Sequence, residues 1–176
     1  KIEVEFNPAK VRAYRLVGYE TRKLNKEDFN DDTKDAGEMG VGHTVTALYE
    51  VVPVGVKSNM IPSVDALKYQ IEEGKSMSKN FSNEMLTVKL RYKEPSGNTS
   101  KLLTKAVVDR GGDDVSQDFR FASAVAMFGQ ILRESKYKGE ADYSQVIALA
   151  KKGLNNDEQG YRREFVRLAE AMKSMN

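Results

Sequence analysis

The chain has 176 residues, 40% of them hydrophobic, which is enough to bury a core as one domain or as a domain with a small subdomain. Because 28 basic residues face 26 acidic ones, the net charge of +2 gives no reason to expect a nucleic-acid partner or an acidic membrane surface. The lack of cysteine excludes disulfides, thiolate metal sites and cysteine nucleophiles, and no apolar run approaches the ~20 residues that span a bilayer.

The chain opens on alternating polar and apolar residues. Ile2, Val4 and Phe6 fall on one face of an extended segment, and Asn7-Pro8 ends it because proline cannot donate to a strand ladder. This opening, which has no initiator methionine, favours a domain cut from a longer polypeptide, with a processed mature N-terminus as the alternative.

Two further segments before the middle of the chain have the composition of strands. Residues 11–21 combine tyrosine, leucine and valine with interspersed charges. Residues 43–54 are β-branched and aromatic with apolar groups on both faces, which predicts a strand in the centre of a sheet. Between them, residues 25–42 are acidic and glycine-containing and are expected to form a surface loop.

A hairpin is expected after a long connection at residues 55–83. Residues 86–92 alternate strictly between apolar and polar, turn residues follow at 95–98, and residues 101–108 have strand composition again. This pattern predicts a hairpin with one face in water.

Three helices are expected after Gly111-Gly112, where the apolar period changes from two to 3.6. The first has such a wide apolar stripe that packing on more than one side is expected; its residues are Phe121, Ala122, Val125, Ala126, Phe128, Ile131 and Leu132. The second runs from about Tyr143 to Lys152, with Asp142 and Gln145 as a capping box and Gly153 as its end. The third places Tyr161, Phe165, Leu168 and Met172 on one face, with Asp157 and Glu158 near its positive end.

Strands followed by helices predict an α+β fold and not an alternating parallel sheet. The expected organisation is an antiparallel, sandwich-like β region over residues 1–114, and a helical region over residues 115–176 packed on it. These regions form one domain, or a domain with a subdomain.

Several unusual sequence motifs in this chain match one family. They are Asn7-Pro8-Ala9-Lys10-Val11, Tyr14-Arg15-Leu16-Val17-Gly18-Tyr19-Glu20, Asp28-Phe29-Asn30, Asp35-Ala36-Gly37-Glu38, Gly42-His43-Thr44-Val45-Thr46-Ala47-Leu48-Tyr49-Glu50 and Phe119-Arg120-Phe121-Ala122. Over nearly its whole length the chain resembles the uncharacterised C-terminal domain of bacterial von Willebrand factor type A domain proteins. The resemblance implies a parent in the periplasm or cell envelope, with an export or lipoprotein signal and a type A domain upstream. That upstream domain would hold the divalent cation, so no cofactor is expected in this chain.

One segment imitates the metal motif of a type A domain, Asp-x-Ser-x-Ser. Asp114-Val115-Ser116-Gln117-Asp118 matches its first four positions but ends in aspartate. Because Ser116 and Asp118 stand just ahead of an apolar helical stripe, they are interpreted as helix-capping residues.

The acidic loop offers the remaining candidates. Asp31, Asp35 and Glu38 could gather around Ca²⁺, but their spacing lacks the EF-hand glycine and terminal glutamate, so a solvated loop is the preferred interpretation. The same loop could face a partner through Asp32, Asp35, Glu38 and His43. His43 is the only histidine, so an alternative hydrolase would have to use it with Asp35 or Glu38. No nucleophile elbow, phosphate-binding loop or His-Glu-x-x-His helix is present.

The sequence therefore predicts a non-catalytic binding or scaffold module. Its expected partner is a protein or the upstream domain of the same parent, with no nucleic acid and no membrane insertion by this part. A mechanical form of this hypothesis holds that strands from before the type A domain complete the sheet formed here, which predicts an exposed sheet edge in this chain.

Overall fold

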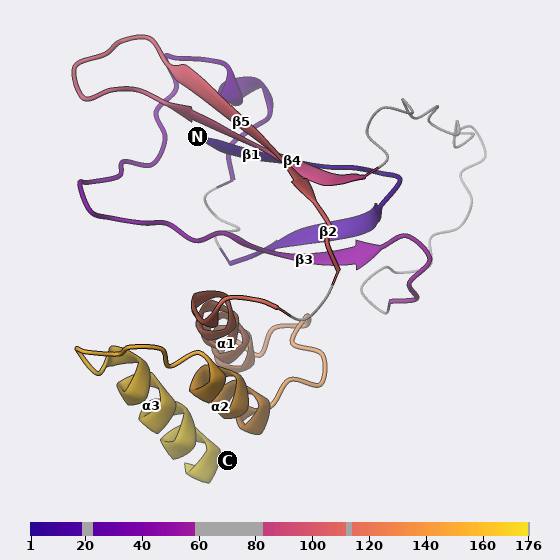
Figure 1. Ribbon diagram of the computed structural model, residues 1–176, viewed down its shortest axis with the longest axis vertical. Helices are drawn as coiled ribbons and strands as arrows, with labels where there is room; N and C mark the ends of the chain where they lie inside the picture. The colour runs from indigo at the N-terminus through magenta and orange to yellow at the C-terminus, as the bar shows by residue number, and fades with distance from the viewer. Residues whose placement is uncertain (19–22, 59–82, 112–113, 176) are drawn as a thin grey trace. The chain divides into compact units, whose positions relative to one another are not determined.

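The computed structural model describes residues 1–18, 23–58, 83–111 and 114–175 (Figure 1). The chain divides into two compact units, one made of Lys1–Val45 with Tyr49–Gly111 and the other of Thr46–Leu48 with Gly112–Asn176. The first unit holds the strands and the second the helices, so the predicted α+β class is confirmed. The last residues of the strand predicted over 11–21 lie outside the described residues, as does most of the connection expected at 55–83.

The larger sheet has three antiparallel strands in the order β1-β4-β5: β1 (Ile2–Phe6), β4 (Glu84–Tyr92) and β5 (Lys101–Val108). The register pairs Val4 with Val88 and Leu90 with Leu103, which confirms the predicted hairpin of β4 and β5. On the polar face, the Lys89 ammonium lies 2.8 Å from Glu3 and 3.0 Å from Glu5. These two hydrogen-bonded carboxylates raise the pKa of Lys89, so this face neutralises its own charges.

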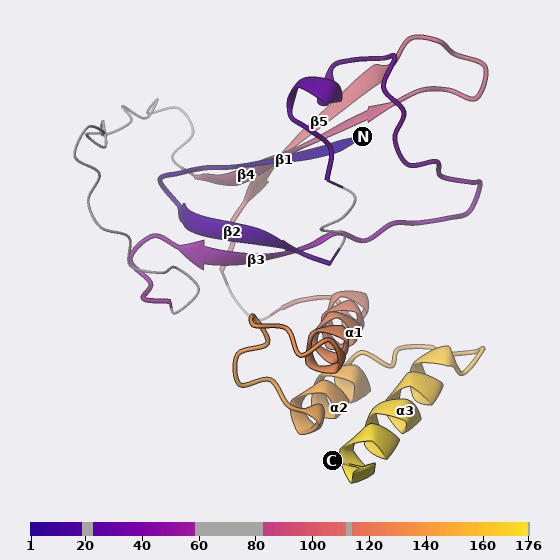
Figure 2. The same ribbon diagram turned by 180° about the vertical axis from the view of Figure 1, so that it is seen from behind.

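The smaller sheet pairs β2 (Val11–Val17) with β3 (Leu48–Pro53) and lies beside β1 in both views (Figures 1 and 2). An ion pair between Arg15 and Glu50 connects its strands. The prediction of a central strand over 43–54 is wrong in two respects. The strand begins only at Leu48, and within the described residues it belongs to the two-stranded sheet β2-β3. The central strand is β4, in the three-stranded sheet. Residues 43–47 have strand propensity but stand exposed, and propensity alone does not supply a neighbouring strand.

Aromatic contacts connect the two sheets. The Phe6 ring stacks on Tyr14 with centroids 4.1 Å apart and meets the edge of Tyr49 at 5.4 Å. Within the described part of this unit only four apolar side chains are buried, namely Phe6, Val11, Phe29 and Val52. The core of the sheet unit is therefore small, and the sandwich-like packing of the sheets stays a prediction.

The helical unit contains α1 (Gln117–Leu132), α2 (Tyr143–Lys152) and α3 (Tyr161–Met175). Ser116 caps α1 by accepting a hydrogen bond from the Phe119 N–H at 3.1 Å, as predicted. Asp142 and Gln145 form the predicted capping box of α2, which ends at Gly153. None of the described helices is long and apolar enough to cross a membrane.

The helices pack through faces that differ from the predicted ones. In α1 the buried residues are Ala124 and Phe128, whereas Val125 and Leu132 are exposed. In α3 the buried residues are Val166 and Ala169, flanked by Phe165 and Met172, whereas Tyr161 and Leu168 are exposed. The inner faces centre on alanines because small residues let helix backbones approach, and a count of large apolar residues misses them.

Candidate binding surface

The first half of the acidic loop is fastened to the β4–β5 hairpin. The short helix η2 (Glu27–Phe29) buries Phe29, and the Arg91 guanidinium lies over its ring at 5.4 Å from the centroid. The same guanidinium donates to Asn30 Oδ1 and to Ser100 Oγ, each at 2.9 Å. We call Phe29, Asn30, Asp32, Arg91 and Ser100 the Arg91 cluster. It gives this part of the loop a structural role.

Two of the predicted acidic candidates are occupied by internal hydrogen bonds. Asp32 Oδ2 accepts a hydrogen bond from the Ser100 N–H at 3.0 Å, and hydrogen bonding with Ser100 lowers the pKa of Asp32. Asp31 Oδ1 accepts from the Thr33 N–H at 2.9 Å and from its hydroxyl at 2.6 Å, and these bonds lower the pKa of Asp31. Both carboxylates are therefore stabilised as anions by the turn and the hairpin that they hold in place.

The remaining candidates of the loop are exposed and separate. Asp35, Glu38 and His43 all lie in the exposed stretch, and the His43 Nδ1 atom contacts the Val41 carbonyl oxygen of its own turn at 3.2 Å. In the described part of the chain no hydrogen bond or ion pair joins His43 to either carboxylate. Nor do three or more possible metal ligands gather anywhere in those residues, so Asp31, Asp35 and Glu38 do not form a cation site there. Whether the loop faces a partner stays a prediction.

The segment that imitates a type A metal motif belongs to the helical unit. Ser116 is the cap of α1, and Asp118 lies inside the first turn, where its carboxylate forms an ion pair with Arg162 of α3 at 2.5 Å. Asp118 therefore connects two helices and is not itself a capping residue.

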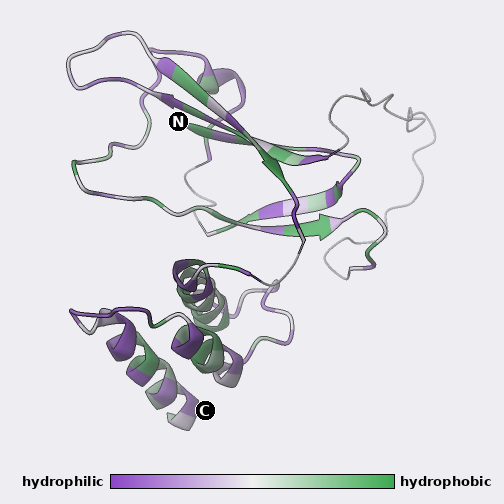
Figure 3. Ribbon diagram, viewed as in Figure 1, coloured by the Kyte–Doolittle hydropathy of each residue, from purple (hydrophilic) through white to green (hydrophobic). Residues whose placement is uncertain are grey.

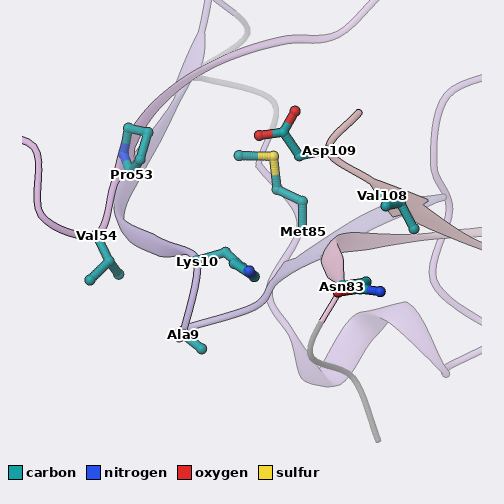
Figure 4. Close-up of a pocket in the computed structure, with 8 residues that line it drawn as sticks. All are labelled: Ala9, Lys10, Pro53, Val54, Asn83, Met85, Val108 and Asp109. Carbon is teal, nitrogen blue, oxygen red and sulfur yellow. The ribbon is translucent and has the colours of Figure 1, made fainter. Parts of the chain in front are cut away.

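An open hollow of about 580 Å³ lies at one end of the two sheets (Figure 4). Turn and strand-end residues line it: Ala9, Lys10, Pro53, Val54, Asn83, Met85, Val108 and Asp109. Its charged groups are one lysine and one carboxylate. No sequence pattern predicts this hollow, because its walls come from four chain segments that only the fold brings together.

The most distinctive surface of the sheet unit is the strand β5. All eight of its residues are exposed, and in the described structure it pairs with β4 alone. Four large apolar side chains are exposed on its two faces, with 48% of Leu102, 56% of Leu103, 37% of Val107 and 46% of Val108 exposed. Figure 3 colours the ribbon of this strand by the hydropathy of its residues. We call these four residues the β5 surface.

The sequence contains a signal for this surface. From Leu86 to Tyr92 of β4 apolar and polar residues alternate, whereas Leu102-Leu103 and Val107-Val108 are adjacent apolar pairs in β5. Neighbouring residues of a strand point to opposite faces, so an apolar pair requires cover on both sides or leaves one side exposed.

A two-unit α+β domain with an open apolar strand at one edge is what the residues build, and comparison with known proteins gives its family. Residues 1–175 match the family described as "Uncharacterized protein YfbK, C-terminal", and the chain belongs to that family. It is 39% identical over 173 residues to the uncharacterized protein YfbK of Escherichia coli strain K12. The match covers 97% of this chain and 28% of that relative, so the chain spans little more than a quarter of the relative's length. No solved structure matches the chain.

Proposed function

We propose that this chain is a non-catalytic binding module of a bacterial cell-envelope protein, in which it supports a von Willebrand type A domain upstream. The observation that carries the proposal is the β5 surface, where four large apolar side chains are exposed on one strand. Soluble proteins seldom leave adjoining apolar side chains in water unless another protein covers them.

The distribution of polar side chains supports binding over chemistry. Lys89 is occupied by Glu3 and Glu5, Arg15 pairs with Glu50, and Arg91 is occupied by the loop. Polar groups of this unit thus stabilise the fold, while its exposed strand offers apolar contact area.

The link to a type A domain is supported by the sequence motifs that carry the family resemblance and by the length of the E. coli relative, most of which lies outside the match. In this proposal the divalent cation belongs to the upstream domain, and the location is the periplasm or cell envelope.

A capture experiment tests the proposal. The tagged 176-residue chain is mixed with the part of E. coli YfbK that lies outside the match, with and without EDTA, and the C-terminal domain of E. coli YfbK serves as positive control. We expect capture that survives chelation, because the scaffold contact does not use the cation. Capture that is lost with EDTA would assign recognition to the upstream metal site, and no capture by either domain would contradict a scaffold role.

The β5 surface supplies the matched variants. Leu103→Ser should reduce capture, because it removes the most exposed apolar side chain of this surface. Leu132→Ser changes a side chain of α1 with a similar exposed fraction, 49%, and should leave capture unchanged.

A further inference from the structure

The hydrogen-bond pattern shows which backbone groups β5 leaves open. The Lys1 N-terminal ammonium donates to the Arg91 carbonyl oxygen at 2.8 Å, and the Arg91 N–H donates back to the Lys1 carbonyl oxygen at 2.9 Å. Arg91 therefore turns its backbone groups toward β1, and the alternation of antiparallel ladders turns those of Leu90 toward β5. Since Leu90 pairs with Leu103, Leu103 bonds β4.

The same alternation leaves the backbone groups of three residues pointing away from β4: Leu102, Thr104 and Ala106. In the described structure no strand lies on that side, because β5 is the last strand in the order β1-β4-β5. This is a free edge with regular spacing, of the kind to which an additional strand binds through backbone hydrogen bonds.

Apolar side chains are also exposed on both faces of the sheet beside this free edge. Leu103 lies on the face that also carries Ile2 and Leu90, since these residues pair across the sheet, and Ile2 and Leu103 are both more than half exposed. A strand added beside β5 would contribute side chains to both faces, and so would cover Leu103 on one face and Leu102 on the other. The small core of the sheet unit leaves room for that contribution.

Charge indicates the composition of the missing strand. The Lys101 ammonium at the start of β5 forms an ion pair with Glu94 at 2.8 Å, whereas the side-chain ammonium of Lys105 in the middle of the strand has no hydrogen bond or ion pair in the described part of the chain. Lysine on an edge strand discourages indiscriminate pairing. A strand with an acidic residue opposite Lys105 and apolar residues beside it would satisfy this lysine.

We infer that the free edge of β5 receives a strand from the polypeptide that precedes this domain in its parent, with an acidic residue facing Lys105. The family is a C-terminal domain, and the match covers 28% of the E. coli relative, so polypeptide is available on the N-terminal side. The inference rests on the proposed scaffold function and specifies its contact. An upstream domain placed before the shared sheet would then be held by backbone hydrogen bonds and not by a flexible linker alone.

Amide hydrogen exchange tests this contact. One sample is the 176-residue chain, measured at two concentrations, and the other is a chimera in which this chain replaces the matching C-terminal part of E. coli YfbK. We expect the amides of Leu102, Thr104 and Ala106 to exchange at least about tenfold more slowly in the chimera than in the isolated chain.

Four variants, two of them controls, separate strand pairing from general stabilisation. Thr104→Pro removes an outward N–H and should abolish the added protection, while the β4–β5 ladder persists because that N–H does not bond β4. Lys105→Glu should reduce the protection and Lys105→Arg should retain it. Lys23→Glu makes the same charge change at an exposed residue outside the strands and should have no effect.

Each other outcome overturns the inference. Slow exchange already present in the isolated chain would show that the edge is covered from within, and slow exchange that grows with concentration would assign it to a second copy. Equal exchange in both samples, together with successful capture in the experiment above, would refute strand pairing while leaving the scaffold function intact. Equal exchange without capture would refute both.

Discussion

Asp157 precedes α3 and stabilises its first turn through hydrogen bonds to the backbone. Its carboxylate accepts from the backbone N–H groups of Arg163 at 2.9 Å and Arg162 at 3.2 Å. Burial would raise the pKa of Asp157, but these hydrogen bonds and the charges of the two arginines outweigh it, so the pKa lies below its ordinary value. Because the folded-state pKa is lowered, the carboxylate contributes stability above about pH 4 and loses it as the pH falls further.

We therefore expect Asp157→Ala to lower the Tm by several degrees at pH 7 and by much less at pH 3. Thermal melts of both proteins followed by circular dichroism across this range check the prediction. Glu158→Gln is the control, since among the described residues its carboxylate accepts a hydrogen bond only from Asn156, two positions earlier in the chain. A Tm difference that is independent of pH would contradict the assigned role of the charge.

Gly153, at the end of α2, lies against the backbone of α1. A Cβ atom built there would lie 2.7 Å from the Phe121 nitrogen and 2.8 Å from the Gln117 carbonyl oxygen, and backbone atoms cannot give way. Gly153→Ala should lower the free energy of unfolding by about 1–3 kcal/mol through overpacking. Gly129→Ala is the matched control, because its Cβ would meet nothing within 4 Å and should raise helix stability by roughly 1 kcal/mol. Urea unfolding of the two variants checks both signs, and a neutral Gly153→Ala would show that the helices can separate freely.

Single residues were predictable where their partner is local in sequence. Ser116, Asp142 and Gln145 act within one turn, so the sequence places them correctly. The close approach at Gly153 and the pairing of Asp118 with Arg162 depend on how two helices cross, and neither spacing nor residue type encodes that.

At the scale of elements, the Arg91 cluster determines whether the loop around η2 stays on the hairpin. Arg91→Ala removes two side-chain hydrogen bonds and uncovers Phe29, so we expect a loss of roughly 1–3 kcal/mol in the free energy of unfolding. It should also speed hydrogen exchange at the Ser100 amide, because this amide donates a hydrogen bond to Asp32 of the released loop. Urea unfolding and amide exchange measure the two effects.

Arg12→Ala is the control for this experiment, because Arg12 is exposed in β2 and makes no such contact in the described residues. If Arg91→Ala leaves the Ser100 amide as slow as before, the loop is held by other contacts. Lys93 is the first to examine, since its ammonium donates to the Asp32 carbonyl oxygen at 2.6 Å.

Elements were predictable from their period, and their neighbours were not. The limits of β1, of the hairpin and of α2 follow from alternation, turn residues and caps. The pairing of β1 with β4 joins residues 80 or more positions apart, and alternation specifies the buried face of a strand but not its partner. For that reason β3 was placed centrally although β4 holds the centre, and the exposure of β5 was missed.

At the scale of the whole molecule, the order of strands and helices predicted the fold class, and the break at Gly111-Gly112 predicted where the helices begin. The candidate site was less predictable from sequence, because the acidic loop has the composition of a ligand site and the apolar pairs of β5 do not. A carboxylate-rich loop has the composition of a ligand site, but composition does not show which hydrogen bonds its carboxylates make. Here Asp31 and Asp32 accept hydrogen bonds from Thr33 and Ser100 and so stabilise the fold.

The helical unit has a core of its own. Ala124, Ala150 and Val166 form one buried cluster and Phe128, Val146 and Ala169 another, both made wholly by α1, α2 and α3. Aromatic contacts add to it, since Phe165 meets the edges of Phe121 and Phe128, each at 5.3 Å between centroids. These contacts do not involve residues of the sheet unit, so the helices contain the apolar surface that a small domain needs to fold.

We therefore expect residues 112–176 alone to fold as a helical domain with a cooperative urea transition. Circular dichroism of this fragment should show α-helix, and its midpoint should match that of the helical signal in the whole chain. Phe165→Ala is the internal control, because truncating a ring shared by both clusters should cost about 3–5 kcal/mol and unfold the fragment. A fragment that shows no cooperative transition, although the whole chain does, would mean that the helices depend on the sheet unit for their stability.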